Sequence, residues 1–261
     1  MKQCKLCLEL VTELKNSHFL PAGIYKRLRD EEWNNPNPWK ITNRTAVQTS
    51  KQQTTRLLCN DCEQRFSKNG EDWVLKYCQQ QDGNFPLASI LAARKPDESS
   101  NNNPTKIYYA SNIPEINISA LAYFAASMFW RGSVHPWNDD GSAPVKLGPF
   151  EEQFRQYLTD MDLKGFPKDC TLLVVVREGE SEVSRLTFPP SGGRKGKFHV
   201  YRFPIPGLAF SVAVGKNIPA EFHRTCFVRG YRNPIAVTPF IEPFLTDYVV
   251  KMLKKIHKCP F

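Results

Sequence analysis

The sequence lacks any long apolar segment of the kind that enters a membrane. Its first residues, Met1-Lys2-Gln3, lead directly into a cysteine pair, so we expect no secretory signal. The longest uncharged apolar run, from Ile116 to Trp130, contains Asn117 and Ser119 and is shorter than the ~20 residues that cross a bilayer. We therefore expect a soluble, cytoplasmic protein without a membrane partner.

The short motifs of several large enzyme classes are also absent. There is no Gly-x-Ser-x-Gly elbow and no dinucleotide-binding fingerprint. The glycine-rich stretch from Ser191 to Lys197 lacks the Gly-Lys-Ser/Thr ending of a P-loop. His135, His199 and His223 have no cysteine or aspartate at the spacing of a nucleophilic site. These absences argue against hydrolases of the serine or cysteine type.

The composition is that of a folded, basic protein. A hydrophobic content of 41% is enough for a true core, and 261 residues suffice for one large domain or two ordinary ones. The 35 basic and 26 acidic residues leave a formal net charge of +9. A positive charge of this size favours polyanionic partners, and nucleic acid is the first of these.

Two cysteine pairs are the strongest chemical signal in the chain. Cys4-x-x-Cys7 and Cys59-x-x-Cys62 supply four thiolates, the number that a tetrahedral structural zinc ion needs, and each pair can chelate from one tight turn. In a reducing compartment such pairs indicate metal binding rather than disulfides. The alternative is two unrelated reduced thiol pairs. The other cysteines are single and are expected to be ordinary thiols: Cys78, Cys170, Cys226 and Cys259.

The chain divides at a polar stretch. Residues 94–105 contain almost no apolar side chain and are typical of a linker or surface loop. This predicts an N-terminal domain at 1–80, a linker or surface loop at 81–105 and a second domain at 106–261. The second domain is predicted to be α+β, with a small antiparallel sheet and a C-terminal helix.

Apolar periodicity and turn residues predict the individual elements. The uncharged stretch from Asn117 to Arg131 predicts a buried helix that Gly132 stops. Alternating runs at 183–188 and 198–203 flank the basic stretch 191–197, which predicts a hairpin with a loose basic tip. Further predicted elements are helices at 21–30, 61–77 with a break at Asn69-Gly70, 150–159 and from Pro243 onward, a hairpin within 40–56, and strands at 171–177 and 208–214.

The order of motifs in the N-terminal part resembles that of a known family. A CxxC pair, Ser17-His18-Phe19-Leu20-Pro21, a polar hairpin and Leu57-Leu58-Cys59-x-x-Cys62-Glu63 together resemble the zinc-stabilised HNH (His-Me finger) endonucleases. The segments 129–133 and 147–152 are similar to uncharacterised bacterial HNH-like proteins associated with phage defence. The resemblance implies a treble-clef zinc finger of the ββα-metal type. It also implies a metal-dependent endonuclease that cuts phosphodiester bonds of nucleic acid, with DNA as the first expected substrate and a role in antiphage defence.

The resemblance also implies roles for individual residues. His18 corresponds to the general base that activates water, and one Mg²⁺ or Mn²⁺ ion stabilises the charge on the phosphate. The zinc ion has a structural role only. This sequence has Ser17 where the family has a metal-binding acid, Thr54 near the position of the central asparagine, and Glu63 in place of the final histidine or asparagine. Glu63 can supply an oxygen ligand to the catalytic ion, with Asp61 or Glu71 as further donors.

A non-catalytic interpretation stands beside this one. His18 is alternatively a structural hydrogen-bonding residue or a substitute zinc ligand, and Glu63 an ordinary solvated helix residue. The finger would then bind nucleic acid or a protein partner without cutting. On either interpretation a protein partner, such as a sensor or ATPase of a defence system, is a further expectation. Eight basic residues are candidates for phosphate contacts, with solvated surface as their alternative role: Lys26, Arg27, Arg29, Arg56, Arg65, Arg194, Lys195 and Lys197.

Overall fold

A seven-stranded sheet is the largest element of the fold. The computed structural model describes residues 1–29, 36–41, 46–100, 103–138, 140–162, 165–177 and 189–239. The strands of the sheet are β7 (Glu98–Ser100), β8 (Asn103–Tyr109), β9 (Cys170–Arg177), β10 (Ser191–Lys195), β11 (Phe198–Ile205), β12 (Leu208–Gly215) and β13 (Pro234–Thr238). Their order is β10-β11-β12-β9-β13-β8-β7, and every neighbouring pair is antiparallel except β9 and β13. The α+β class expected from the sequence is confirmed.

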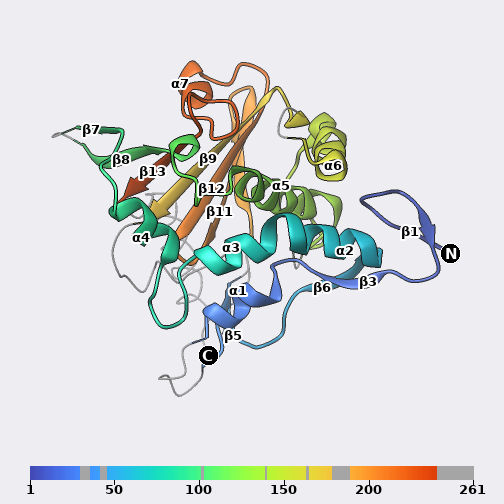
Figure 1. Cartoon of the computed structure of the whole chain (residues 1–261). Coiled ribbons are helices and arrows are strands. Elements are labelled where there is room, and N and C mark those ends of the chain that lie inside the picture. Colours follow the sequence, from blue (N-terminus) through green and yellow to red (C-terminus); the bar gives the residue numbers. More distant parts are fainter. Residues whose placement is uncertain are drawn as a thin grey trace, which may run out of the picture.

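Helix α5 (Ile118–Val134) lies between this sheet and the helices of the N-terminal part (Figure 1). Asn117 begins it as N-cap, because its side-chain oxygen accepts a hydrogen bond from the backbone N–H of Ala120 at 2.9 Å. Helix α6 (Glu151–Asp160) packs beside it. Neither α5 nor any other helix in the described ranges has the length and apolar character needed to cross a membrane.

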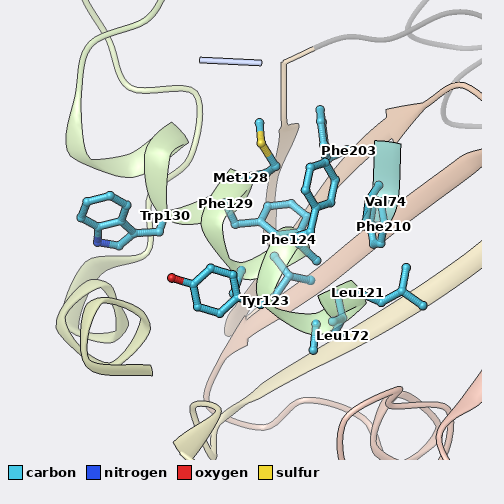
Figure 2. Packing of buried hydrophobic residues seen from close by; sticks show 14 of the residues in the cluster. Val74, Leu121, Tyr123, Phe124, Met128, Phe129, Trp130, Leu172, Phe203 and Phe210 are labelled. Atoms are coloured by element: carbon cyan, nitrogen blue, oxygen red, sulfur yellow. The ribbon is translucent and has the colours of Figure 1, made fainter. Parts of the chain in front are cut away.

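Both faces of α5 carry aromatic side chains. Toward the sheet, Phe124 packs against Phe203 and Phe210, with ring centroids 6.2 Å and 5.6 Å apart (Figure 2). On another face, Trp130 meets the ring of Phe66 edge-on at 6.0 Å. A helix that is covered on several faces has to be apolar nearly all round, which explains the uncharged stretch seen in the sequence.

Helix α5 continues through Gly132, so the prediction that this glycine ends the helix is wrong. Gly132 is helical, and α5 continues to Val134 before His135 adopts an extended backbone ahead of Pro136. A Cβ atom on Gly132 would lie 2.8 Å from a methyl carbon of Val145. The glycine is therefore explained by close packing against a later loop, and the proline accounts for the end of the helix.

Residues 1–77 form a smaller unit of short strands and helices. Its elements are β1 (Lys2–Gln3), β2 (Leu10–Val11), β3 (Lys15–His18), α1 (Ala22–Arg27), β4 (Trp39–Ile41), β5 (Ala46–Gln48), β6 (Thr54–Leu58), α2 (Asn60–Phe66), the π-helical η1 (Ser67–Glu71) and α3 (Asp72–Tyr77). Strand β1 pairs with β2, β3 with β6 and β4 with β5, all antiparallel. The predicted hairpin within 40–56 and the short helix after Pro21 are confirmed.

The predicted helix break at Asn69-Gly70 is a π-helical turn that keeps α2 and α3 continuous. Gly70 lies against the backbone of α5, where a Cβ atom would be 2.9 Å from the amide nitrogen of Phe124. Only glycine allows two helices to approach this closely without displacing one of them. The local irregularity thus follows from a long-range contact.

The basic stretch predicted to be a loose hairpin tip is instead an edge strand. β10 pairs with β11 along its whole length, and only Gly196 and Lys197 form the turn between them. A Cβ atom on Gly192 would collide with the carbonyl oxygen of Val200, so this glycine permits close strand pairing rather than a loop. The predicted strand at 183–188 and the predicted C-terminal helix lie outside the described residues.

Ordered elements occupy the segment predicted to be a linker. Helix α4 (Pro86–Ala92), β7 and the start of β8 fall within 81–105. One hydrophobic cluster contains residues from both sides of this segment, for example Phe66 and Phe210. The two parts therefore share a core, and the division into separate domains stays a prediction. The remaining short elements are η2 (Ala110–Asn112), η3 (Gly148–Phe150) and α7 (Ala220–Arg224).

Candidate metal centre

The two cysteine pairs meet in space. Cys4 and Cys7 come from the turn between β1 and β2, while Cys59 and Cys62 come from the first turn of α2. The four Sγ atoms all lie within 4.8 Å of one another, and those of Cys7 and Cys59 are 3.8 Å apart. A tetrahedral zinc site with Zn–S bonds of ~2.3 Å places its sulfur atoms ~3.8 Å apart. The donor set can therefore hold a metal ion such as zinc.

Backbone hydrogen bonds close the first cysteine turn and join it to β6. The first turn is closed by Leu8 N–H, which donates to Cys4 O at 3.0 Å, and by Cys4 N–H, which donates to Glu9 O at 2.9 Å. Leu8 has φ of 65°, which lets the chain reverse there. Lys5 N–H donates to Leu57 O at 3.1 Å and joins the turn to β6. Arg155 on α6 also donates to Leu6 O at 2.7 Å, so turn geometry, a strand contact and one contact from a distant helix together set the positions of the sulfur atoms.

The four sulfur atoms lie close enough to change one another's protonation. A hydrogen bond from Cys62 lowers the pKa of the Cys4 thiol to about 4, and the same contact raises the pKa of Cys62. Burial raises the pKa of Cys7. Four neighbouring sulfur atoms cannot all be thiolates unless a positive charge lies between them, because each negative charge disfavours the next. A divalent ion supplies that charge and deprotonates its thiol ligands.

His18 lies at the other end of the same strand pair. It is the last residue of β3, opposite Thr54 in β6, and it is half-buried. The preceding Ser17 is buried, and its hydroxyl accepts a hydrogen bond from Leu58 N–H at 3.2 Å. Successive side chains of a strand point to opposite faces, so His18 faces away from that contact. The sulfur cluster contains four cysteines and does not include His18.

Glu63 follows the last cysteine on α2. It is half-buried, and within the described chain its Oε1 atom is buried without a hydrogen-bond partner. A buried carboxylate oxygen without a partner is costly, and a bound cation would satisfy it. Asp61 is exposed, whereas Glu71 binds Arg131 at 2.5 Å and is not a free donor. The described residues contain no second group of three or more metal-binding side chains.

The predicted phosphate-binding residues fall into two groups. Arg27 donates to Gly23 O at 2.8 Å and to Leu75 O, and Arg65 donates to Thr159 O, so these two guanidinium groups are engaged within the fold. Lys26 is exposed on α1, Arg56 on β6, and Arg194, Lys195 and Lys197 at the β10 edge of the sheet, while Arg29 is half-buried. The structure therefore distributes the exposed cations over separate elements.

The sequence analysis missed two residues, one on α5 and one in the loop after it, that contact the N-terminal unit. Arg131 is 2% exposed and binds Glu71, and Trp137 stacks on Phe19 with ring centroids 4.8 Å apart. A single arginine at the end of an otherwise uncharged helical run was the available signal, because an unpaired cation is rarely buried. Its partner could not be identified, since Glu71 lies on a different helix.

Comparison with known proteins identified no relative of this chain. No family model, no curated protein and no solved structure matches this chain. The HNH resemblance therefore rests on the order of motifs in the sequence, and the site is assessed by the geometry of its own residues.

Proposed function

We propose that this chain is a zinc-stabilised, HNH-like endonuclease that hydrolyses phosphodiester bonds of nucleic acid, with DNA as the expected substrate. The observation that carries the proposal is the arrangement of β3, β6 and α2. One strand pair followed by one helix carries His18 at the end of β3, and a four-sulfur cluster and the buried oxygen of Glu63 where β6 leads into α2. The order of these elements agrees with the motif order that resembles the HNH family.

The architecture supports a treble-clef finger. A CxxC turn, an antiparallel strand pair and a helix that begins with the second CxxC pair are its components, and this chain has them in that order. Zinc is the expected ion because four thiolates in a closed tetrahedral set are typical of structural zinc sites. In this proposal the zinc ion holds the hairpin to the helix and takes no part in the reaction.

The chemistry is assigned to His18 at the end of β3 and to Glu63, which follows the last cysteine on α2. As general base, the His18 imidazole takes a proton from the water that attacks the scissile phosphate, a role that histidine fills more often than any other side chain. Glu63 is the proposed oxygen ligand for Mg²⁺ or Mn²⁺. When bound, that ion would stabilise negative charge on the phosphate and the leaving oxygen. Lys26 and Arg56 are exposed candidates for phosphate contacts on adjoining elements.

A second candidate function is a non-catalytic zinc module that binds nucleic acid or a protein partner. One specific observation favours it. Ser17 stands where the family has a metal-binding acid, and its hydroxyl is used by the Leu58 N–H group inside the finger. Glu63 would then be an ordinary residue of α2 that holds no catalytic ion.

Cleavage assays separate the two functions. Purified protein would be incubated with supercoiled plasmid or single-stranded RNA and Mg²⁺ or Mn²⁺, beside His18→Ala and Glu63→Gln. We expect nicking by the wild type and a loss of roughly 100-fold or more in His18→Ala, as for removal of a general base. His223→Ala, which alters an exposed histidine on α7, is the matched control and should cut normally. All variants would be matched for zinc content and circular dichroism.

Three results would refute the nuclease proposal. Equal cutting by wild type and His18→Ala would assign the activity to another site or to a contaminant. No cutting of either substrate with either ion, combined with tight binding of labelled duplex DNA, would favour the non-catalytic module. Absence of both cutting and binding would direct the search to a protein partner.

A further inference from the structure

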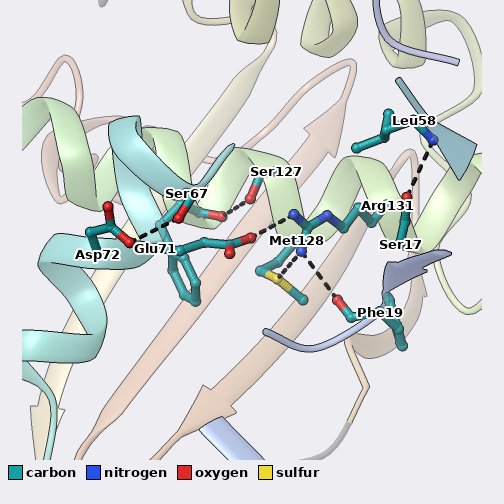
Figure 3. Close-up of polar contacts among 10 residues, drawn as sticks. Ser17, Phe19, Leu58, Ser67, Glu71, Asp72, Ser127, Met128 and Arg131 are labelled. Carbon is teal, nitrogen blue, oxygen red and sulfur yellow. Dashed lines mark hydrogen bonds and ion pairs between the residues drawn. The ribbon is translucent and has the colours of Figure 1, made fainter. Parts of the chain in front are cut away.

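The residue after His18 is held by a buried arginine from α5 (Figure 3). Arg131 Nη1 lies 3.5 Å from the carbonyl oxygen of Phe19, a long contact from a charged donor. Its Nη2 binds Glu71 Oε1 at 2.5 Å, and the guanidinium group lies over the ring of Phe66, 4.5 Å from its centroid. One side chain therefore joins the end of β3 to η1 and α2.

A tryptophan holds the same residue from another side. The ring of Trp137 stacks on Phe19 at an interplanar angle of 13°, and its Nε1–H donates to the carbonyl of Arg131 at 2.6 Å. Gln53 completes the arrangement, because its side chain donates to Trp137 O at 2.8 Å while its own carbonyl accepts from Phe19 N–H at 2.9 Å. The amide, the carbonyl and the ring of Phe19 are thus all engaged. We call Arg131, Trp137 and Gln53 the Phe19 clamp.

Stability alone is a poor explanation for the arginine in this clamp. Arg131 is 2% exposed, and its Nε has no hydrogen-bond partner among the described residues. Removing a guanidinium group from water is costly, and well-packed apolar residues often serve as well as a buried ion pair. An arginine adds geometric specificity, because the donors of its planar guanidinium group have fixed directions and so set the relative position of the groups that they bind.

We propose that Arg131 is a positioning residue that sets the backbone of Phe19 and, through it, the orientation of the His18 imidazole. This inference rests on the proposed nuclease function, in which His18 is the base. It also assigns a role to the C-terminal part of the chain, because Arg131 and Trp137 both lie beyond the polar stretch at 94–105. The finger would then carry the base, while α5 and the loop after it hold that base in place.

The catalytic consequence is a change in turnover rather than in binding. Displacing a reacting group by about 1 Å can reduce a rate by roughly 100-fold. We expect Arg131→Lys to lower kcat about 10- to 100-fold with KM nearly unchanged, because lysine keeps the charge but cannot bind Glu71 and Phe19 at once. Glu71→Gln should show a smaller loss of the same kind.

NMR spectroscopy can test whether the Phe19 clamp sets the environment of Phe19 and His18, and it does not require enzymatic activity. Protein labelled with ¹³C at phenylalanine carbonyls and ¹⁵N at leucine amides gives carbonyl correlations only for Phe-Leu pairs, which in this sequence are Phe19-Leu20 and Phe244-Leu245. A Leu245→Met variant assigns the two signals. In Arg131→Lys we expect the Phe19 carbonyl signal to move and the His18 imidazole signal to shift or broaden, at unchanged zinc content and melting temperature. His18→Asn identifies the imidazole signal.

Arg229→Lys is the matched control for this test. Arg229 also binds backbone carbonyl groups, among them those of Phe166 and Pro167, but on a separate loop. It should leave the Phe19 and His18 signals unchanged. Unchanged signals in folded, zinc-loaded Arg131→Lys would overturn the inference. A roughly 10- to 100-fold rise in KM with unchanged kcat would overturn it as well. If the wild type cuts no nucleic acid, the nuclease proposal fails and the catalytic role of Arg131 fails with it, whereas a moved Phe19 signal would still establish the clamp.

Discussion

The two ends of the β3–β6 strand pair are held by different means. At one end, four cysteines from two tight turns gather their sulfur atoms within 4.8 Å of one another. At the other end, Phe19 is held by contacts from Arg131 and Trp137, which lie far away in the sequence. At the cysteine end, the candidate ligands come from two tight turns, with one contact from the distant Arg155. The histidine end depends on tertiary packing. Loss of the contacts from Arg131 and Trp137 should therefore disturb the orientation of His18 more than it disturbs the cysteine cluster.

The largest expected effect comes from breaking the cysteine end. Cys59→Ser should lose the bound metal and unfold the finger, because structural zinc contributes roughly 10 kcal/mol of binding free energy that is coupled to folding. Zinc content by mass spectrometry and the melting temperature would measure this. Cys78→Ala changes a buried thiol outside the cluster and should keep the metal. Full metal content in Cys59→Ser would contradict the assignment of the four ligands.

The next effect comes from breaking the buried pair at the histidine end. Arg131→Met leaves Glu71 with an unpaired, mostly buried carboxylate and should lower the free energy of unfolding by about 3 kcal/mol. Chemical denaturation would measure the change. Arg94→Met is the matched control, since its partner Glu115 is largely exposed and water replaces the lost contact. Equal effects of the two substitutions would show that the Arg131 pair behaves as an ordinary surface pair.

A smaller effect is expected where the finger helix meets α5. Gly70→Ala places a methyl group 2.9 Å from the amide nitrogen of Phe124 and should cost about 1–3 kcal/mol, because two packed backbones have to move apart. Gly193→Ala is the control, since no atom lies within 4 Å of its added methyl group. A neutral or stabilising Gly70→Ala would mean that the π-helical turn can relax without affecting α5.

The smallest effect should come from the hydrogen bond of the tryptophan. Trp137→Phe keeps a ring against Phe19 but removes the donor to Arg131 O, and we expect a loss of about 1 kcal/mol in unfolding free energy. Trp73→Phe, in a ring that stacks on Tyr77, is the comparison outside the clamp. If Trp137→Phe nevertheless reduced kcat strongly, the ring orientation would matter more to His18 than the arginine contact does.

Several features could be predicted from the sequence because they depend on neighbours along the chain. The buried strand at 171–177 follows from its β-branched run, and the hairpin within 40–56 from alternation and turn residues. Other features could not be predicted in this way. The glycine-rich run 191–195 forms a strand because β11 lies beside it, and the helix continues through Gly132, where a glycine leaves room for Val145. In both cases a contact with a distant residue outweighed the local preference.

The sequence by itself identified the four cysteines that could hold a metal ion. Chelation from a tight turn requires two cysteines separated by two residues, and this spacing is legible without a structure. It also determined the α+β class, through the periods of its apolar residues. Only the tertiary structure decided which charged and aromatic residues surround Phe19. The contacts among Arg131, Glu71 and Trp137 join segments that no local rule connects, because the partner of a buried charge is set by the packing of helices that are distant in the sequence.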